Sequence, residues 1–369
     1  MDLNKDLKKP KRKTTLIKPG VAAVLLLFSA LFNAAAWFVP GFSDLFTDNV
    51  FVHISRIYGS LTSLAPFSVG EIMLIIGVLL IPAAIILAVL KKPQFLRALP
   101  LIIAIVVTVM SLNCFVLYHC SPIPCGTSEG KEYNLEDLTI LRDYIVKKCN
   151  EMAEEIPHDE QGNVIYDGDM KAQAKKAVAG LSSQYKRLGG FNVTPKALTF
   201  SGFMSQQYMQ GYYFPFSMEA NYNDEMSIMN KPFTMCHELT HTHGYIYEDE
   251  ANFLGFLACI NSDDPVFRYS GYLGVLNYVN NDFYDAVDEE TYKAHVRISD
   301  QVRYDNLFLT DEAWERVEDN AILDTETVKK AADTFIDTNL KVNGVSEGKV
   351  SYGKVVDHLL YYYDNHPYN

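Results

Sequence analysis

Residues 236–252, CHELTHTHGYIYEDEAN, concentrate side chains that bind metals and move protons. His237 and His241 are four residues apart, so a helix would project both imidazoles from one face, where they can bind a single metal ion. Glu238 would lie about 100° further round that helix, within reach of a metal-bound water rather than of the metal. This HExxH arrangement predicts a catalytic zinc site, with Glu238 as the general base.

A catalytic zinc ion normally has three protein ligands and an open position for water, so the motif needs a third ligand. The longer pattern HExxHxxGxxH is met through Gly244 and then fails, because Tyr247 occupies the position of its last histidine. The third ligand is therefore expected to be an acid. Glu248 and Glu250 are the two candidates.

These two glutamates lie on different faces if the segment is helical, because residues two apart point about 200° apart. Glu248 shares its face with small residues, which would let the histidine helix approach closely: Asn252, Gly255 and Cys259, with Ala251 beside them. Glu250 shares its face with bulky residues: Phe253, Leu254 and Leu257. The pattern favours Glu248 as the third ligand. It requires the chain to reverse sharply near Gly244, and glycine tolerates such a turn.

A structural metal site is the main alternative, and it would make the protein a membrane receptor or scaffold without hydrolytic activity. Structural zinc sites usually fill four positions with protein ligands, and Cys236 or His243 would be the fourth. Glu238 has no use in such a site, so its presence favours an enzyme.

A tyrosine or histidine often stabilises the oxyanion of the transition state in zinc peptidases. The sequence offers four candidates, and their spacing does not select among them: Tyr222, Tyr245, His295 and His358.

Three long uncharged runs precede the motif, at residues 21–39, 72–90 and 98–118. Their lengths of 19, 19 and 21 residues are close to the roughly 20 that a helix needs to cross a bilayer. We predict three transmembrane helices. A cleaved signal peptide is the alternative for the first run, but this run exceeds the roughly 7–15 residues of a signal core.

Basic residues predict the orientation of these helices. They precede the first run and fill the link between the second and the third: Lys5, Lys8, Lys9, Lys11, Arg12 and Lys13, then Lys91, Lys92 and Arg97. Residues 1–20 and this link are therefore expected in the cytoplasm, and the chain after about residue 119 outside the cell membrane.

The acidic balance bears on the partners of the protein. The formal net charge of the 369-residue chain is −13, which would repel the phosphates of nucleic acid. We expect the lipid bilayer and a peptide or protein substrate as partners, and no nucleic acid.

Six cysteines fit this placement. Cys114 falls within the third predicted span, and the other five lie outside it. In an oxidising compartment the segment CSPIPC, residues 120–125, can close a small disulfide loop. The alternative is that all five external cysteines are reduced and buried as small apolar residues.

The chain after the spans divides into a polar linker, residues 119–134, and one domain, residues 135–369. Apolar residues at three- and four-residue spacing predict helices over the segments 135–152, 174–188 and 352–363, and Thr310 is a candidate helix cap. Apolar residues alternate over 212–218, which predicts a strand, and Pro215 makes it an edge strand. A mainly helical domain with a small sheet is expected.

The segment EDEAN resembles the E-x-x-A-[DN] signature of the glutamate helix in relatives of the CAAX prenyl proteases and, more loosely, in thermolysin-like enzymes. This resemblance implies that Glu248 is the ligand, Ala251 a small packing residue, and Asn252 a partner that orients a ligand histidine.

Across nearly the whole chain, the segments FPFSMEANYN, CHELTHTHGY, EDEANFLGFLAC and VSYGKVVDHLL resemble a bacterial membrane family known as domain of unknown function 3810. The resemblance implies a zincin-like metallopeptidase of the gluzincin type. We therefore expect an α-helical membrane anchor of three transmembrane helices, followed by a mainly α, α+β zincin-like domain. In this domain His237, His241 and Glu248 would bind Zn²⁺.

Overall fold

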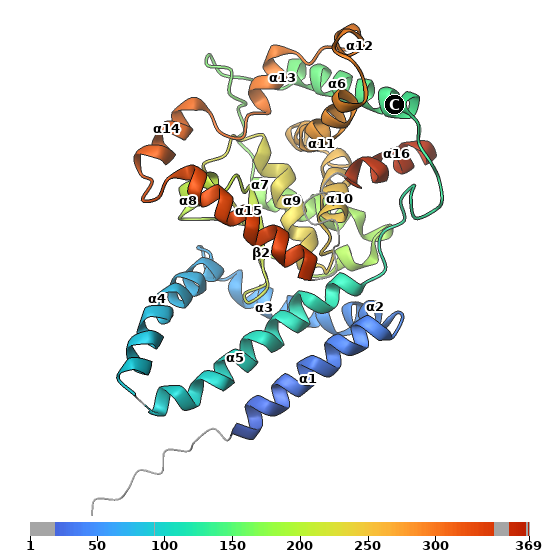
Figure 1. Ribbon diagram of the computed structural model, residues 1–369. Coiled ribbons are helices and arrows are strands. Elements are labelled where there is room, and N and C mark those ends of the chain that lie inside the picture. Colours follow the sequence, from blue (N-terminus) through green and yellow to red (C-terminus); the bar gives the residue numbers. More distant parts are fainter. Residues whose placement is uncertain (1–18, 92, 343–353, 367, 369) are drawn as a thin grey trace, which may run out of the picture.

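The computed structural model describes residues 19–91, 93–342, 354–366 and 368. Most of the basic N-terminus that predicts the orientation lies outside the described residues, as does Tyr352. The described part has two ends (Figure 1). Three long helices, α1, α4 and α5, extend from one end, and the other helices and a small sheet gather at the other.

The three predicted apolar helices are present, with bounds shifted by a few residues. They are α1 (Pro19–Phe38), α4 (Val69–Val89) and α5 (Pro93–Asn113). The stretches long and apolar enough to cross a membrane are Gly20–Phe38, Val69–Val89 and Ala98–His119. The third stretch extends beyond α5 because a 3-10 helix, η2 (Phe115–His119), continues it.

The segment between the first two apolar helices is itself helical, which the sequence did not indicate. It forms α2 (Phe42–Phe46), a π-helical turn η1 (Thr47–Phe51) and α3 (Val52–Thr62). On α3, Ser55 and Gly59 are buried, whereas Ile57 and Leu61 are 60% and 65% exposed. Because residues two apart on a helix point about 200° apart, α3 has one packed face and one exposed apolar face.

The remaining helices form one mainly helical domain, as predicted. They are α6 (Leu135–Glu155), α7 (Met170–Gly180), α8 (Ser201–Gln206), α9 (Asn230–Thr242), α10 (Glu248–Ile260), α11 (Pro265–Ala286), α12 (Glu289–Ala294), α13 (Asp300–Asp305), α14 (Asp311–Asp319), α15 (Thr325–Val342) and α16 (Val355–Asn365). Helices α9, α10 and α11 pack on one another at the centre, and α6, α7 and α16 cover them. Most buried apolar residues of this domain form one core, whereas Tyr213, Met218 and Ile246 pack in a second cluster with the segments 36–51 and 114–118.

One local prediction was wrong in extent, and another is confirmed. The helix expected over 174–188 ends at Gly180, and two 3-10 turns follow it, η3 (Leu181–Ser183) and η4 (Lys186–Gly189). The cap at Thr310 is confirmed, because its side chain accepts a hydrogen bond from the backbone N–H of Ala313 at the start of α14.

The single strand expected over 212–218 is instead a hairpin. Strand β2 (Gly211–Phe214) pairs antiparallel with β3 (Glu219–Tyr222), and the turn contains Pro215 and Met218, the latter with a φ of 54°. Proline cannot donate a ladder hydrogen bond, and a positive φ reverses the chain, so the strand ends at Phe214 although the apolar alternation continues to Met218. Strand β1 (Lys196–Ala197) lies on the other side of β3, so β2 is an edge strand as predicted.

All six cysteines are free thiols. The loop expected from Cys120 and Cys125 is therefore not closed by a disulfide. The thiol of Cys120 is buried and lies 3.2 Å from the hydroxyl of Thr47, and this contact joins η1 to the segment after the third apolar helix.

Candidate metal centre

Helix α9 carries the HExxH motif in its last two turns and is buried along most of its length. The imidazoles of His237 and His241 point to the same side, with ring centroids 4.7 Å apart. Beyond the helix, Gly244 has a φ of +89° and turns the chain back, as the sequence predicted. A side chain there would also clash, because a Cβ would lie 2.6 Å from Cγ2 of Thr47.

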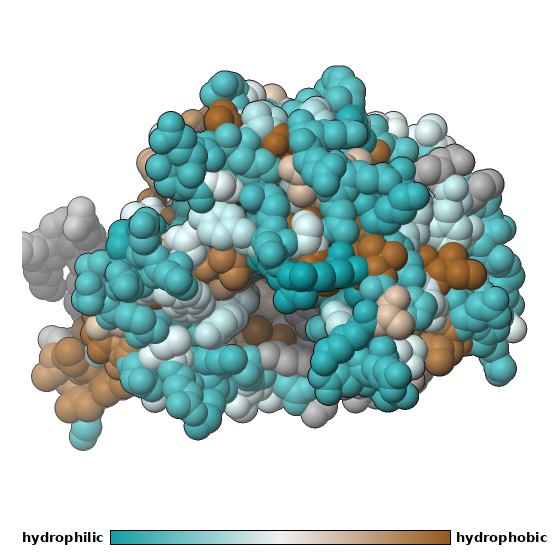
Figure 2. All heavy atoms as spheres, turned by 90° about the horizontal axis from the view of Figure 1, so that it is seen from above, coloured by the Kyte–Doolittle hydropathy of each residue, from teal (hydrophilic) through white to brown (hydrophobic). Residues whose placement is uncertain are grey.

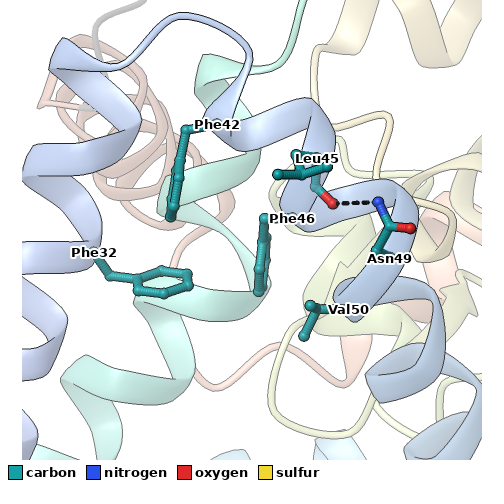
Figure 3. A pocket seen from close by; sticks show the side chains of 6 residues that line it. All are labelled: Phe32, Phe42, Leu45, Phe46, Asn49 and Val50. Atoms are coloured by element: carbon teal, nitrogen blue, oxygen red, sulfur yellow. Dashed lines mark hydrogen bonds between the residues drawn. The ribbon is translucent and has the colours of Figure 1, made fainter.

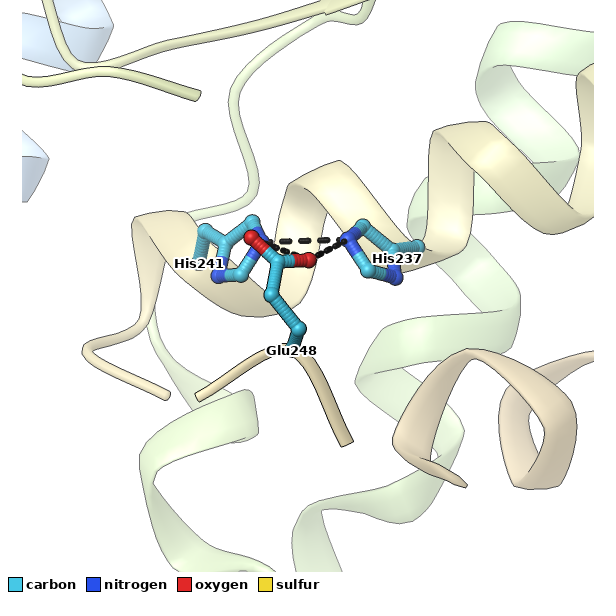
Figure 4. Close-up of side chains that lie close together, drawn as sticks. All are labelled: His237, His241 and Glu248. Atoms are coloured by element: carbon cyan, nitrogen blue, oxygen red, sulfur yellow. Dashed lines mark hydrogen bonds and ion pairs between the residues drawn. The ribbon is translucent and has the colours of Figure 1, made fainter. Parts of the chain in front are cut away.

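The reversed chain brings the start of α10 to the two histidines. Tyr247 is the N-cap residue and Glu248 the first residue of this helix. Nε2 of His237 lies 3.1 Å from Nε2 of His241, and Oε2 of Glu248 lies 3.2 Å and 3.7 Å from these two nitrogens (Figure 4). The three side chains can therefore offer one ligand atom each within 4.8 Å of one another.

These distances fit the donor set of a zinc ion. Nitrogen and oxygen ligands bind zinc at about 2.0–2.1 Å, so two ligands of a tetrahedral site are about 3.3 Å apart. The three separations between the ligand atoms, 3.1, 3.2 and 3.7 Å, lie close to this value, two below it and one above it. Three protein ligands also leave a fourth tetrahedral position for water.

The close approach of α10 depends on the small residues that the sequence analysis singled out. A Cβ on Gly255 would lie 3.2 Å from the backbone nitrogen of His237. Glu250 lies on another face, where its carboxylate accepts a hydrogen bond from the backbone N–H of Ile123 at 2.6 Å. The structure thus brings Glu248 to the histidines, and it does not bring Glu250 there.

Further contacts orient the two imidazoles. Nδ1 of His241 lies 2.7 Å from the carbonyl oxygen of Tyr245. Since a carbonyl only accepts, Nδ1 carries a proton, and Nε2 is the nitrogen that can bind a metal once it has lost its own proton. Burial lowers the pKa of His237, whereas the neighbouring Glu248 and Asn252 oppose this shift, and the Asn252 amide donates to the hydroxyl of Tyr278 at 3.4 Å.

Replacing Asn252 with alanine should weaken zinc binding without removing a ligand. Loss of a residue that orients a ligand histidine typically costs about 10- to 100-fold in metal affinity. We expect a decrease of this size in a competition titration with a zinc chelator. Asn261→Ala is the matched control, because Asn261 is the C-cap of the same helix, and among the described residues its amide donates to the carbonyl oxygen of Leu257 alone. An affinity equal to that of the wild type in Asn252→Ala would contradict the orienting role.

Glu238 is buried next to this cluster but does not join it. Its Oε2 atom has no hydrogen-bond partner within the part of the chain that the structure describes. Oε1 faces strand β2, where a Cβ on Gly211 would lie only 2.7 Å away. Burial raises the pKa of Glu238 to about 8, the nearby Glu248 adds to this, and His241 opposes it. Glu238 is thus a buried carboxyl group that can exchange a proton near the ligands.

The partly exposed Glu248 and the buried His241 form a pair whose pKa values shift in opposite directions. Burial alone would raise the pKa of Glu248, but hydrogen bonds from the two histidines hold it well below its usual value. Burial alone would lower the pKa of His241, but Glu248 raises it to about 9. The carboxylate is thus ionised and draws positive charge toward the histidines, as a site for a divalent cation requires.

The other candidates from the sequence lie outside the cluster. The Cys236 thiol lies 4.0 Å from the carbonyl oxygen of Ala174, and Nε2 of His243 lies 2.9 Å from Oδ1 of Asn192. Neither belongs to the metal-ligand group.

The four candidates for the oxyanion role have other partners. His295 pairs with Asp143, His358 stacks on Phe253, and the rings of Tyr222 and Tyr245 face Lys171 and Arg187.

Sequence reasoning missed Tyr278, which α11 places beside Asn252. The two residues are 26 positions apart, so no local spacing relates them.

Comparison with known proteins gives one match. The family model described as "Protein of unknown function (DUF3810)" matches residues 46–360. No curated protein and no solved structure matches the chain.

Proposed function

The chain belongs to the DUF3810 family, whose function is unknown, and we propose that it is a membrane-anchored zinc metallopeptidase. One observation carries the proposal. The ligand atoms of His237, His241 and Glu248 converge within 4.8 Å, and the buried carboxyl of Glu238 lies beside them without a hydrogen-bond partner for Oε2 among the described residues. This is the arrangement of a metal site with a separate general base.

Each residue has a distinct role in the proposed hydrolysis. A zinc ion at this site would supply Lewis-acid activation of water. His237, His241 and Glu248 hold and orient the ion. Glu238 takes a proton from the attacking water, whose oxygen bonds to the peptide carbon. Glu238 then delivers this proton to the nitrogen of the leaving amine as the C–N bond breaks.

The edge strand β2 is the proposed binding surface for the substrate backbone. An extended peptide can add to an exposed sheet edge through main-chain hydrogen bonds. Gly211 on β2 lies directly against Glu238, so a peptide paired with β2 would pass next to the general base. A larger side chain at position 211 would displace Glu238.

The alternative, a receptor or scaffold with a structural metal, finds less support. Such a site would use a fourth protein ligand, but neither Cys236 nor His243 reaches the other three. It would also leave unexplained why Glu238 is buried without a partner for Oε2 among the described residues, because an unpaired buried polar group costs stability.

Purified full-length protein should contain about one zinc per chain and hydrolyse a mixed library of unstructured peptides. A zinc chelator should abolish the hydrolysis, and added Zn²⁺ should restore it. The products are identified by mass spectrometry. Hydrolysis that survives complete removal of the metal would overturn the proposal.

We also propose that the helical domain lies outside the cell, because basic residues flank the cytoplasmic ends of the predicted spans. A protease added to intact cells, or to spheroplasts if a wall intervenes, should digest the chain after residue 119. A cytoplasmic marker protein serves as the control for lysis. Protection of the domain until the membrane is disrupted would reverse the topology.

A further inference from the structure

We infer that the substrate is a polypeptide anchored in the same membrane, cut a few residues beyond the end of its transmembrane segment. This inference rests on the proposed peptidase function and adds where the substrate is held. Three separate sets of contacts tie the candidate metal centre to the outer ends of the apolar helices.

The first contact joins the metal-binding helix to α3. The hydroxyl of Ser55 donates to the carbonyl oxygen of Thr242, the last residue of α9, at 2.6 Å. The opposite face of α3 exposes Ile57 and Leu61. A helix with one packed face and one exposed apolar face, placed beside apolar spans, is suited to lie in the membrane interface. Helix α3 therefore separates the end of α9 from the lipid.

The segment before α3 also continues the apolar surface of the first span. A hollow of about 360 Å³ opens between α1 and the α2–η1 segment (Figure 3). Its lining is almost wholly apolar: Phe32, Phe42, Leu45, Phe46, Asn49 and Val50. The amide of Asn49 is satisfied by the carbonyl oxygen of Leu45, so the hollow presents hydrocarbon. Phe32 belongs to the first span, so α2 and η1 lie at the outer end of α1.

The second contact joins the start of α10 to the third span. The hydroxyl of Tyr247, the residue before Glu248, donates to the carbonyl oxygen of Tyr118 at 2.5 Å. Tyr118 lies in the last turn of that span. Next to it, the His119 ring packs on Trp37 at 4.5 Å. Trp37 is more than half exposed at the end of α1, a position typical of the aromatic belt at a membrane surface.

The third set of contacts fixes the β2–β3 hairpin. The amide of Asn113, at the end of α5, donates to the carbonyl oxygen of Pro215 at 2.7 Å. The hydroxyl of Tyr213 donates to the carbonyl oxygen of Asn113 at 3.1 Å, and the Tyr213 ring lies 6.2 Å from that of His241. One tyrosine side chain thus spans the interval between a proposed zinc ligand and the end of the third helix.

The other side of the hairpin is held by α4. The buried carboxylate of Glu219 accepts from the backbone N–H groups of Val69 and Gly70, at 3.1 Å and 2.6 Å, in the first turn of that helix. Lys196 pairs with the same carboxylate at 2.5 Å. The hairpin that contains β2, the strand proposed to bind the substrate, is therefore bound to two of the three spans, α4 and α5 (Figure 1).

These contacts set the distance from lipid to metal. A helix with its side chains is about 10–12 Å across, and this is the thickness that α3 places between the end of α9 and the membrane. An extended chain advances about 3.3–3.6 Å per residue. A substrate leaving the membrane beside the hairpin would reach the metal after about three to four residues.

A soluble polypeptide would instead enter from the opposite face. The face remote from the three spans is largely hydrophilic and is hollowed near its middle (Figure 2). If substrates entered from that side, their attachment to the membrane would have no effect on their cleavage. The two routes therefore predict different cleavage sites.

The test uses full-length protein in vesicles of phosphatidylethanolamine and phosphatidylglycerol. One set of substrates carries a 20-residue transmembrane helix followed by a mixed-sequence tail of 20 residues, and a second set consists of the free tails. We expect the anchored tails to be cut at least about tenfold faster, with cuts clustered about three to four residues from the helix. Free tails cut at the same rate, or cuts spread evenly along the anchored tails, would overturn the inference.

Variants of α3 provide a second readout. Ile57→Asp and Leu61→Asp place a charge on the face proposed to lie in lipid, and should reduce the ratio of anchored to free cleavage severalfold. Ile322→Asp, at an even more exposed apolar residue between α14 and α15, should leave the ratio unchanged. An unchanged ratio in all three variants would contradict the membrane position of α3 and with it the inference. If the wild type cuts neither substrate set, the peptidase proposal fails as well.

Discussion

Glu238→Gln should lose hydrolysis while the protein keeps its zinc. Glutamine has nearly the shape of glutamate but cannot take a proton from water, and removal of a general base typically costs about 10²- to 10⁴-fold in rate. None of the three ligand atoms belongs to Glu238, so about one zinc per chain should remain. Zinc content and peptide hydrolysis are measured on the same preparation.

The burial of Glu238 makes this variant informative. The wild-type carboxyl has no hydrogen-bond partner for Oε2 among the described residues, so a neutral amide should fold at least as well. A normal melting temperature would then exclude misfolding as the cause of lost activity. His237→Ala is the contrasting variant, and it should lose both zinc and activity. Full activity in Glu238→Gln on an identified substrate would show that another group moves the proton.

The local part of the metal centre could be predicted from the sequence because helix geometry determines it. His237 and His241 lie one turn apart, and Gly244 permits the reversal that brings Glu248 back to them. The small face of α10 was also readable, since Gly255 lies against the backbone of His237.

Contacts between distant segments could not be predicted in this way. Tyr278 contacts Asn252 from another helix, and neither the residue types nor their spacing predicts this contact. In helix α3 the apolar residues at helical spacing, Ile57 and Leu61, are exposed, whereas the packed face consists of the small residues Ser55 and Gly59, so apolar periodicity alone does not identify its buried face. The β2–β3 hairpin was predicted as one strand because apolar residues continue to alternate through its turn. The contact from Asn113 to Pro215 shows why that turn lies where it does.

The second large effect should distinguish the two glutamates of α10. Glu248→Gln replaces an ionised ligand with a neutral amide, and its loss should weaken zinc binding by more than the roughly 100-fold upper range for orienting residues. Glu250→Gln is the matched control, because Glu250 lies on another face of the same helix and bonds the backbone of Ile123. Zinc content of the two purified variants is the measurement. Zinc lost only from Glu250→Gln would show that the wrong acid has been assigned.

Glu250→Gln should also change how the stability of the protein depends on pH. Burial raises the pKa of Glu250 from 4.5 to about 8, whereas hydrogen bonding to Ile123 opposes the rise. Between these two values the folded chain keeps a proton that the unfolded chain has lost, so Glu250 makes the wild type less stable as the pH rises toward 8. Glutamine cannot ionise, so the melting temperature of Glu250→Gln should gain on that of the wild type from about pH 5 to pH 8. If the melting temperatures of the two proteins changed with pH in parallel over this range, Glu250 would already be ionised in the folded protein. The ionisation of Glu250 would then resemble that of Glu248 more closely than the positions of the two residues on α10 imply.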